Sequence, residues 1–244
     1  MAGILVQIVL SWVIIWLFEK KDLDVLGWKP NQTRLKHFSL FFFLTALFCA
    51  SPYLIRIFIS GEEWKVNPVL NVALILNGTW WNIKSVLFEE LIFRGVILYI
   101  LARRLGAKTG IILSAVAFGI YHWFSFGVLG NAGAMVFTFL ITGIMGLVLA
   151  YGYVKTLSLY IPIAIHLGWN LTKIFVFSDG PIGNGLFIPA DKTPFRTDSW
   201  VIAFAVFLMP ILLTYIVNFI LIRRIRGADI KMDSPRITED ITIT

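Results

Sequence analysis

The chain has 244 residues, of which 58% are hydrophobic and only 14% are charged, and its mean hydropathy is +0.83. An average soluble domain has roughly 45–50% apolar and about 25% charged residues. This surplus of apolar side chains excludes a soluble enzyme, a disordered chain and a disulfide-stapled secreted module, and it predicts a polytopic membrane protein. The net charge of +7 does not indicate nucleic-acid binding, because the Lys and Arg residues are spread over short loops, as the positive-inside rule describes. A single cysteine excludes internal disulfides and a Cys-based zinc site.

Seven runs of the chain are long and apolar enough to cross a bilayer, which takes about 20 mostly apolar residues. Each is expected to be helical, because backbone amides in lipid must find partners within their own segment. The alternation typical of a membrane β-barrel is absent from the sequence. The predicted fold is therefore an all-α transmembrane helical bundle, with spans at 2–18, 38–59, 85–101, 109–126, 132–151, 156–177 and 200–222.

The apolar stretch 69–84 has two interpretations. It holds Asn71, Asn77 and the pair Trp80 and Trp81, and paired tryptophans are typical of the membrane–water interface. We expect an interfacial segment here, with an eighth span as the alternative.

The basic residues predict the orientation of the bundle. They gather in the stretch 20–36, around 103–108, at Lys155 and at 223–226, whereas the loops 61–68 and 127–131 are poorer in them. By the positive-inside rule, the N-terminus lies outside and the C-terminus is cytoplasmic. Because the nearest basic residues follow the run 2–18, we expect an uncleaved first span rather than a removed signal peptide. The segments 178–199 and 228–244 are expected to form an outer loop and a polar cytoplasmic tail.

Five ionisable residues lie inside the predicted spans, where such groups are costly and usually mark a pathway or a site. At 1.5 Å per residue, Glu89 and His122 each lie about 21 Å, and His166 about 17 Å, from the basic ends of their helices. The three side chains therefore share one depth, near the middle of a core about 30 Å thick, and we expect them to meet. The full candidate set is Glu89, Glu90, Arg94, His122 and His166, with Asn170 as a neutral polar companion.

Helical spacing predicts which of these side chains share a face. Glu90 and Arg94 are four residues apart, so the guanidinium can neutralise this carboxylate, while Glu89 is rotated by about 100° and faces a cavity. His166 and Asn170 are also four apart and project from one face. Taken singly, an intramembrane Glu–Arg pair, a histidine or an asparagine often serves only to hold helices together. Their common depth on three helices indicates a functional site instead.

These residue types suit hydrolysis. A carboxylate and an imidazole can activate water as a general base, and a second imidazole with an amide can stabilise an oxyanion. Two histidines and a glutamate could also hold zinc, although the HExxH pattern is absent. A proton-coupled transporter is the non-enzymatic alternative, although no paired, interrupted spans indicate inverted repeats.

Three motifs carry a resemblance to a known family. Residues 89–95, EELIFRG, resemble the EExxxR motif of the CPBP intramembrane proteases, residues 118–122, FGIYH, are similar to its FxxxH motif, and residues 166–170, HLGWN, to its HxxxN motif. The family includes type II CAAX prenyl endopeptidases and bacterial proteins linked to bacteriocin processing or self-immunity. The motifs occur in the family's order, and the resemblance spans roughly 81–177.

The resemblance implies a glutamate-dependent endopeptidase in a bacterial plasma membrane. In it, Glu89 would activate the water with help from His122, His166 and Asn170 would line the oxyanion site, and Glu90 and Arg94 would hold the architecture. No cofactor is expected, with zinc as the alternative. The expected partners are the bilayer and a peptide or protein substrate in the membrane, which could be lipidated, and no nucleic acid. We divide the chain into N-terminal spans (1–68), a catalytic core (69–177) and an outer loop, last span and tail (178–244).

Overall fold

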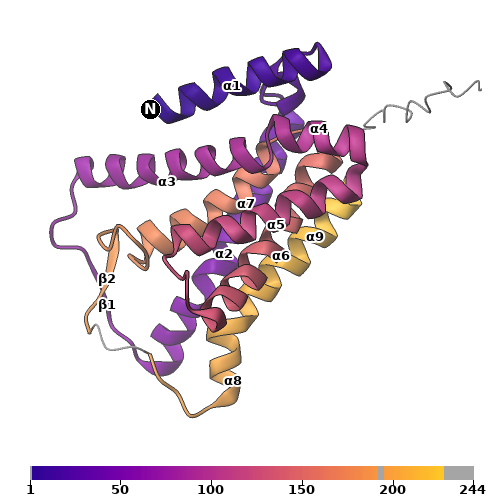
Figure 1. Ribbon diagram of the computed structural model, residues 1–244. Helices are drawn as coiled ribbons and strands as arrows, with labels where there is room; N and C mark the ends of the chain where they lie inside the picture. Colours follow the sequence, from indigo (N-terminus) through magenta and orange to yellow (C-terminus); the bar gives the residue numbers. More distant parts are fainter. Residues whose placement is uncertain (1, 192–194, 228–244) are drawn as a thin grey trace, which may run out of the picture.

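The computed structural model describes residues 2–191 and 195–227, so the predicted cytoplasmic tail at 228–244 lies outside the described residues. The described part is almost entirely helical (Figure 1). Short connecting turns are the 3₁₀ turn Leu23–Leu26 and the π-helical turns Leu171–Val176 and Phe204–Leu208. The main elements are α1 (Ala2–Glu19), α2 (Gln32–Ser60), β1 (Trp64–Val66), α3 (Val72–Phe93), α4 (Val96–Leu105), α5 (Ala107–Ser125), α6 (Ala132–Thr156), α7 (Tyr160–Asn170), β2 (Phe187–Pro189), α8 (Trp200–Ala203) and α9 (Met209–Arg224).

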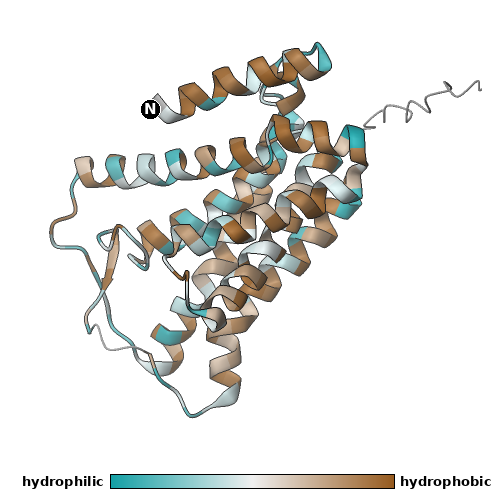
Figure 2. Cartoon of the chain, in the orientation of Figure 1, coloured by the Kyte–Doolittle hydropathy of each residue, from teal (hydrophilic) through white to brown (hydrophobic). Residues whose placement is uncertain are grey.

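The helices form an integral membrane protein. By length and composition, three helical stretches among the described residues can cross a membrane, namely Gln32–Ser60, Ala132–Thr156 and Trp200–Arg224, and Gly3–Glu19 is a shorter apolar helix. Large apolar side chains are exposed along the bundle, and apolar stretches run along the helices (Figure 2). This confirms a helical membrane protein, while the number of spans stays a prediction.

Close helix packing holds the centre of the bundle together. Helices α5 and α6 pack along each other, as do α2 and α7, and small residues permit these close approaches. A Cβ added at Gly168 of α7 would lie 2.6 Å from the carbonyl oxygen of Phe42 in α2, and one at Gly146 of α6 would lie 3.1 Å from Cα of Ala115 in α5. Helix α7 is therefore positioned by backbone contact with α2.

The prediction for 69–101 was wrong in its helix boundaries. The stretch 69–84 is not a separate segment, because α3 runs without interruption from Val72 to Phe93. The break comes later, at Arg94 and Gly95, so the predicted single span 85–101 consists of the end of α3 and all of α4. Gly95 has φ −81° and ψ −143°, which is not helical, and α4 starts afresh after it.

Other boundaries moved by a few residues. Helix α2 begins at Gln32, where the side chain of Asn31 caps it by accepting from the N–H of Arg34 at 2.8 Å, so 32–37 is helix rather than loop. Helix α6 extends to Thr156, and α7 starts only at Tyr160. The predicted outer loop contains β2, which pairs antiparallel with β1 and makes the fold nearly, rather than wholly, α-helical.

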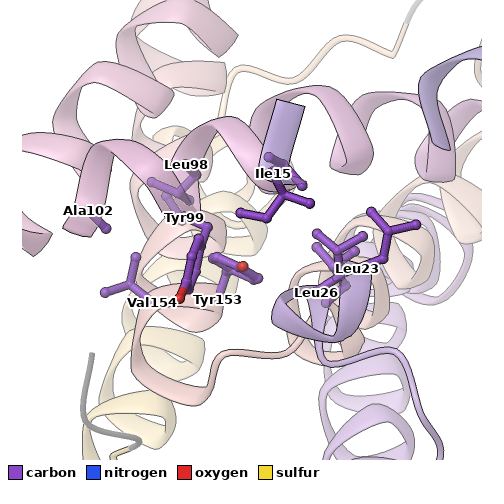
Figure 3. Packing of buried hydrophobic residues seen from close by; sticks show 11 residues of the cluster. Ile15, Leu23, Leu26, Leu98, Tyr99, Ala102, Tyr153 and Val154 are labelled. Atoms are coloured by element: carbon purple, nitrogen blue, oxygen red, sulfur yellow. The ribbon is translucent and has the colours of Figure 1, made fainter. Parts of the chain in front are cut away.

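A buried apolar cluster ties α1, α4 and α6 together near one end of the molecule (Figure 3). Ile15 of α1 and Tyr153 of α6 are fully buried in it, and the Tyr153 hydroxyl donates to the carbonyl of Val25 at 2.8 Å. Glu19 of α1 forms ion pairs with Arg103 and with Arg104 in the last turn of α4. These contacts fix α4, and with it the end of α3 that precedes it in the chain.

Candidate active site

Two adjacent carboxylates lie in the last turn of α3. Both Glu89 and Glu90 are buried, and the helix ends one turn later, where the N–H of Arg94 donates to the carbonyl of Glu90 at 2.8 Å. Successive residues of a helix point about 100° apart, so the two carboxylates reach different neighbours.

Glu90 is the hub of a fully buried ion-pair network. Its Oε2 lies 3.4 Å from Nε of Arg94, as the four-residue spacing predicts, and neither side chain is exposed. Its Oε1 lies 2.7 Å from Nδ1 of His166 in α7. The Arg94 guanidinium also lies 3.9 Å from the ring centroid of Phe118 in α5, a cation–π contact. Glu90 therefore links α3 to α7 and gives the buried guanidinium its counter-charge.

The His122 ring is oriented by its own helix. Its Nδ1 lies 2.8 Å from the carbonyl oxygen of Phe118, one turn earlier in α5. A carbonyl oxygen can only accept, so we assign the proton to Nδ1. In the neutral ring, Nε2 then carries a lone pair, and this atom faces Glu89.

Glu89 lies between the two histidines. Its Oε2 is 3.9 Å from Nε2 of His122 and 3.8 Å from Nε2 of His166. This oxygen is buried and has no hydrogen-bond partner within the described part of the chain. Both distances are too long for direct hydrogen bonds, and polar contacts of this length are often bridged by water. Each of these two separations accommodates a bridging water oxygen about 2.8 Å from both atoms.

Asn170 lies one turn after His166, at the end of α7, and is partly buried. Its side-chain amide makes no hydrogen bond to the described residues, in contrast to the two histidine rings. The structure thus brings Glu89, His122 and His166 together, and it leaves the Asn170 amide available to a ligand.

Glu89 also borders a pocket of about 210 Å³ between α1, α3 and α5. Gly3 and Ile4 of α1 and Tyr121 of α5 contribute to its wall, as does Lys84, the one basic residue among those lining it. Lys84 was not among the residues predicted from the sequence, because it falls at the edge of the expected interfacial segment. Lys84 lies three residues after Trp81 and four before Phe88, and this spacing places the three lining residues on one face of a helix, which is the signal that could have found it.

The donor atoms around Glu89 are too far apart to ligate a zinc ion. A tetrahedral zinc about 2.1 Å from its ligands requires those ligands to lie about 3.4 Å apart, whereas Glu89 Oε2 is 3.8 and 3.9 Å from the two Nε2 atoms. Across residues 2–191 and 195–227, no group of three or more His, Cys, Asp or Glu side chains has the geometry to hold a metal ion. The residues as arranged therefore do not fit a zinc ion.

Comparison with known proteins gives one match. The family described as type II CAAX prenyl endopeptidase Rce1-like matches residues 69–172, which contain all three motifs and every residue of the site described above except α1. Neither the curated proteins nor the solved structures compared with the chain gave a match. The match confirms the resemblance predicted from the motifs, and it indicates a protease of the CAAX type embedded in the membrane. Residues 69–172 of this chain are thus similar to the type II CAAX prenyl endopeptidase Rce1-like family.

Proposed function

We propose that the chain is an intramembrane endopeptidase in which Glu89 activates a water molecule for attack on a peptide bond. The observation that carries this proposal is the buried, unbonded Oε2 of Glu89, which faces Nε2 of both His122 and His166 at 3.9 and 3.8 Å. A carboxylate so placed has a free lone pair for the proton of one water held between the two rings.

The two histidines differ in role because their Nδ1 atoms have different partners. His122, whose Nδ1 is held by a backbone carbonyl, accepts a hydrogen bond from the water at Nε2 and orients it. His166 is held by the Glu90 carboxylate. When ionised, Glu89, Glu90 and Arg94 sum to one negative charge, and we place the balancing proton on Nε2 of His166. That N–H is then a donor for the oxyanion.

The reaction proceeds in two steps. Glu89 takes a proton from the water as the water oxygen bonds to the carbonyl carbon of the substrate. The negative charge that develops on the carbonyl oxygen is stabilised by Nε2–H of His166 and by the amide of Asn170. As the C–N bond breaks, the proton on Glu89 passes to the leaving nitrogen, so that the products are a carboxylic acid and an amine.

The pocket beside Glu89 is the proposed entry for the peptide. It places the apolar wall of α1 opposite α3 next to the attacking group, which suits a substrate that is itself in the membrane or carries a lipid. We place the protein in a bacterial plasma membrane, and the positive-inside rule supports a cytoplasmic C-terminus there.

The test is cleavage of a membrane-peptide library by the purified protein in detergent. Glu89→Gln is expected to lower kcat by about 10²- to 10⁴-fold, the usual contribution of a general base, and His166→Ala is expected to abolish cleavage. Glu63→Gln is the matched control, because this carboxylate is exposed. Cleavage by Glu89→Gln at the rate of the control would refute the assignment.

Two further measurements separate this mechanism from a zinc-dependent protease and from a transporter. Cleavage that persists with a chelator supports water activation by Glu89 alone, whereas loss of cleavage that zinc restores would support a metal. A proton flux in liposomes without any cleavage would support transport and refute the proteolytic function.

A further inference from the structure

A second pocket, of about 480 Å³, lies far in the sequence from the Glu89 site, between the start of α2, the start of α7 and the end of α9. We name it the basic pocket. None of the described residues that line it is acidic, and those that bear on its chemistry are Asn31, Thr33, Arg34, His37, Tyr160 and Arg226.

The basic pocket presents hydrogen-bond donors that the described residues do not use. One guanidinium nitrogen of Arg34 donates to the carbonyl of Lys29 at 2.6 Å, and its other nitrogens make no hydrogen bond to the described residues. Arg226 is exposed and makes no ion pair with the described residues. The ring of His37 is half-buried beside Phe41 and makes no hydrogen bond to the described residues. Asn31 uses only its oxygen, to cap α2. The starts of α2 and α7 add the positive ends of two helix dipoles. Arg34 also interacts electrostatically with Asp24, whereas Arg226 has no acidic partner among the described residues. Guanidinium groups with free N–H donors are the chemistry that binds a phosphate group.

The surroundings of the basic pocket indicate which kind of molecule carries the phosphate group. Helices α2 and α9, which frame the basic pocket, pack against each other and expose large apolar side chains further along their length, among them Leu35 and Phe43 on α2 (52% and 68% exposed) and Ile216 on α9 (53%). The Tyr160 hydroxyl donates to the carbonyl of Trp28 at 3.1 Å, and Trp28 itself is 44% exposed. Aromatic residues of this kind are typical of the headgroup level of a membrane.

We propose that the basic pocket binds the headgroup phosphate of an anionic phospholipid, whose acyl chains lie along the apolar faces of α2 and α9. The pocket is at the end of the bundle where the basic residues gather, and anionic lipids are enriched in the cytoplasmic leaflet that such an end faces. It does not depend on the chemistry at Glu89. Bound lipid bridges the first turn of α2 and the last turn of α9, two segments about 190 residues apart in sequence.

The test is lipid binding to the delipidated full chain in detergent, measured by native mass spectrometry with phosphatidylglycerol. Arg34→Gln with Arg226→Gln is expected to weaken binding about 30-fold, since each basic residue near a membrane surface contributes about 1 kcal/mol and 1.4 kcal/mol is tenfold. The matched control is Arg223→Gln with Arg224→Gln, which removes the same charge from the end of α9 outside the pocket and is expected to weaken binding less than threefold. Equal losses in the two double variants would overturn the proposal.

Three additional measurements test whether a phospholipid, and not another anion, occupies the basic pocket. If the double variant fails to fold, Arg226→Gln alone carries the test, with an expected loss of about fivefold. Inorganic phosphate that binds alone and displaces the lipid at millimolar concentration would make a free anion the ligand and overturn the proposal. The segment 228–244 carries four acidic residues, so a chain ending at Gly227 is compared as well. Lipid binding seen only in that shorter chain would make the protein's own acidic segment the occupant and would also overturn it.

Discussion

Replacing Glu90 by glutamine tests the central ionic contact of the site. The carboxylate is completely buried and serves two partners at once, Nε of Arg94 at 3.4 Å and Nδ1 of His166 at 2.7 Å. Glutamine keeps the size and one carbonyl oxygen for the histidine, but it removes the charge. The fully buried guanidinium of Arg94 then loses its nearest counter-ion.

The magnitude follows from this burial. Removing one partner of a buried ion pair typically costs about 3–5 kcal/mol, because the remaining charge is left in a medium that solvates it poorly. For a chain of this size, 1 kcal/mol shifts the thermal midpoint by about 2–4 °C, so Glu90→Gln is expected to lower it by roughly 6–20 °C. Adding Arg94→Met removes the stranded charge and is expected to restore most of the stability, since buried pairs can often be replaced by apolar groups.

The assay is thermal unfolding in one detergent, with Glu63→Gln as the control for an exposed carboxylate. The double variant is expected to regain stability without regaining the cleavage rate, because the ring of His166 keeps only a neutral partner. A thermal midpoint of Glu90→Gln equal to that of the control would refute the importance of the buried ion pair. So would a double variant that is less stable than Glu90→Gln alone.

Three further outcomes are expected. Gly168→Ala should lower the thermal midpoint, because the added methyl would lie 2.6 Å from the backbone oxygen of Phe42. Gly133→Ala, whose nearest contact would be 3.7 Å away, should leave the midpoint unchanged. Equal midpoints of the two variants would contradict the close approach of α7 to α2. Lys84→Met should raise KM several-fold for peptides that carry a carboxylate and leave KM for neutral peptides unchanged. The reason is that Lys84 is the one cation among the described residues lining the pocket beside Glu89. Steady-state kinetics on matched pairs of charged and neutral peptides measures this difference, and an equal KM change for both would contradict it. His122→Leu should lower kcat at least tenfold with little change in KM, since the ring orients the water rather than the peptide; a change confined to KM would reassign it to substrate binding.

Much of the site was predictable from the sequence because charges in an apolar helix are conspicuous. Glu89, His122 and His166 were selected as ionisable residues at a common depth in predicted spans, although the break at Arg94 and Gly95 removes the continuous helix along which the depth of Glu89 was counted. Oε2 of Glu89 lies within 4 Å of Nε2 of each histidine. The Glu90–Arg94 pair followed from helical spacing. The contact of Glu90 with His166 did not, because spacing within one helix contains no information about a residue 76 positions away on another.

The sequence by itself determined that this is a helical membrane protein with ionisable groups in its apolar core, since composition and periodicity are properties of each segment alone. Where α3 ends, which nitrogen of each histidine faces Glu89, and that Lys84 borders the same pocket were decided only by the tertiary structure. These features depend on helices separated in the chain that meet through backbone contact at small residues such as Gly168. Hydropathy averages over a segment, whereas such contacts are set by the shape of single side chains and by the partner that each one finds.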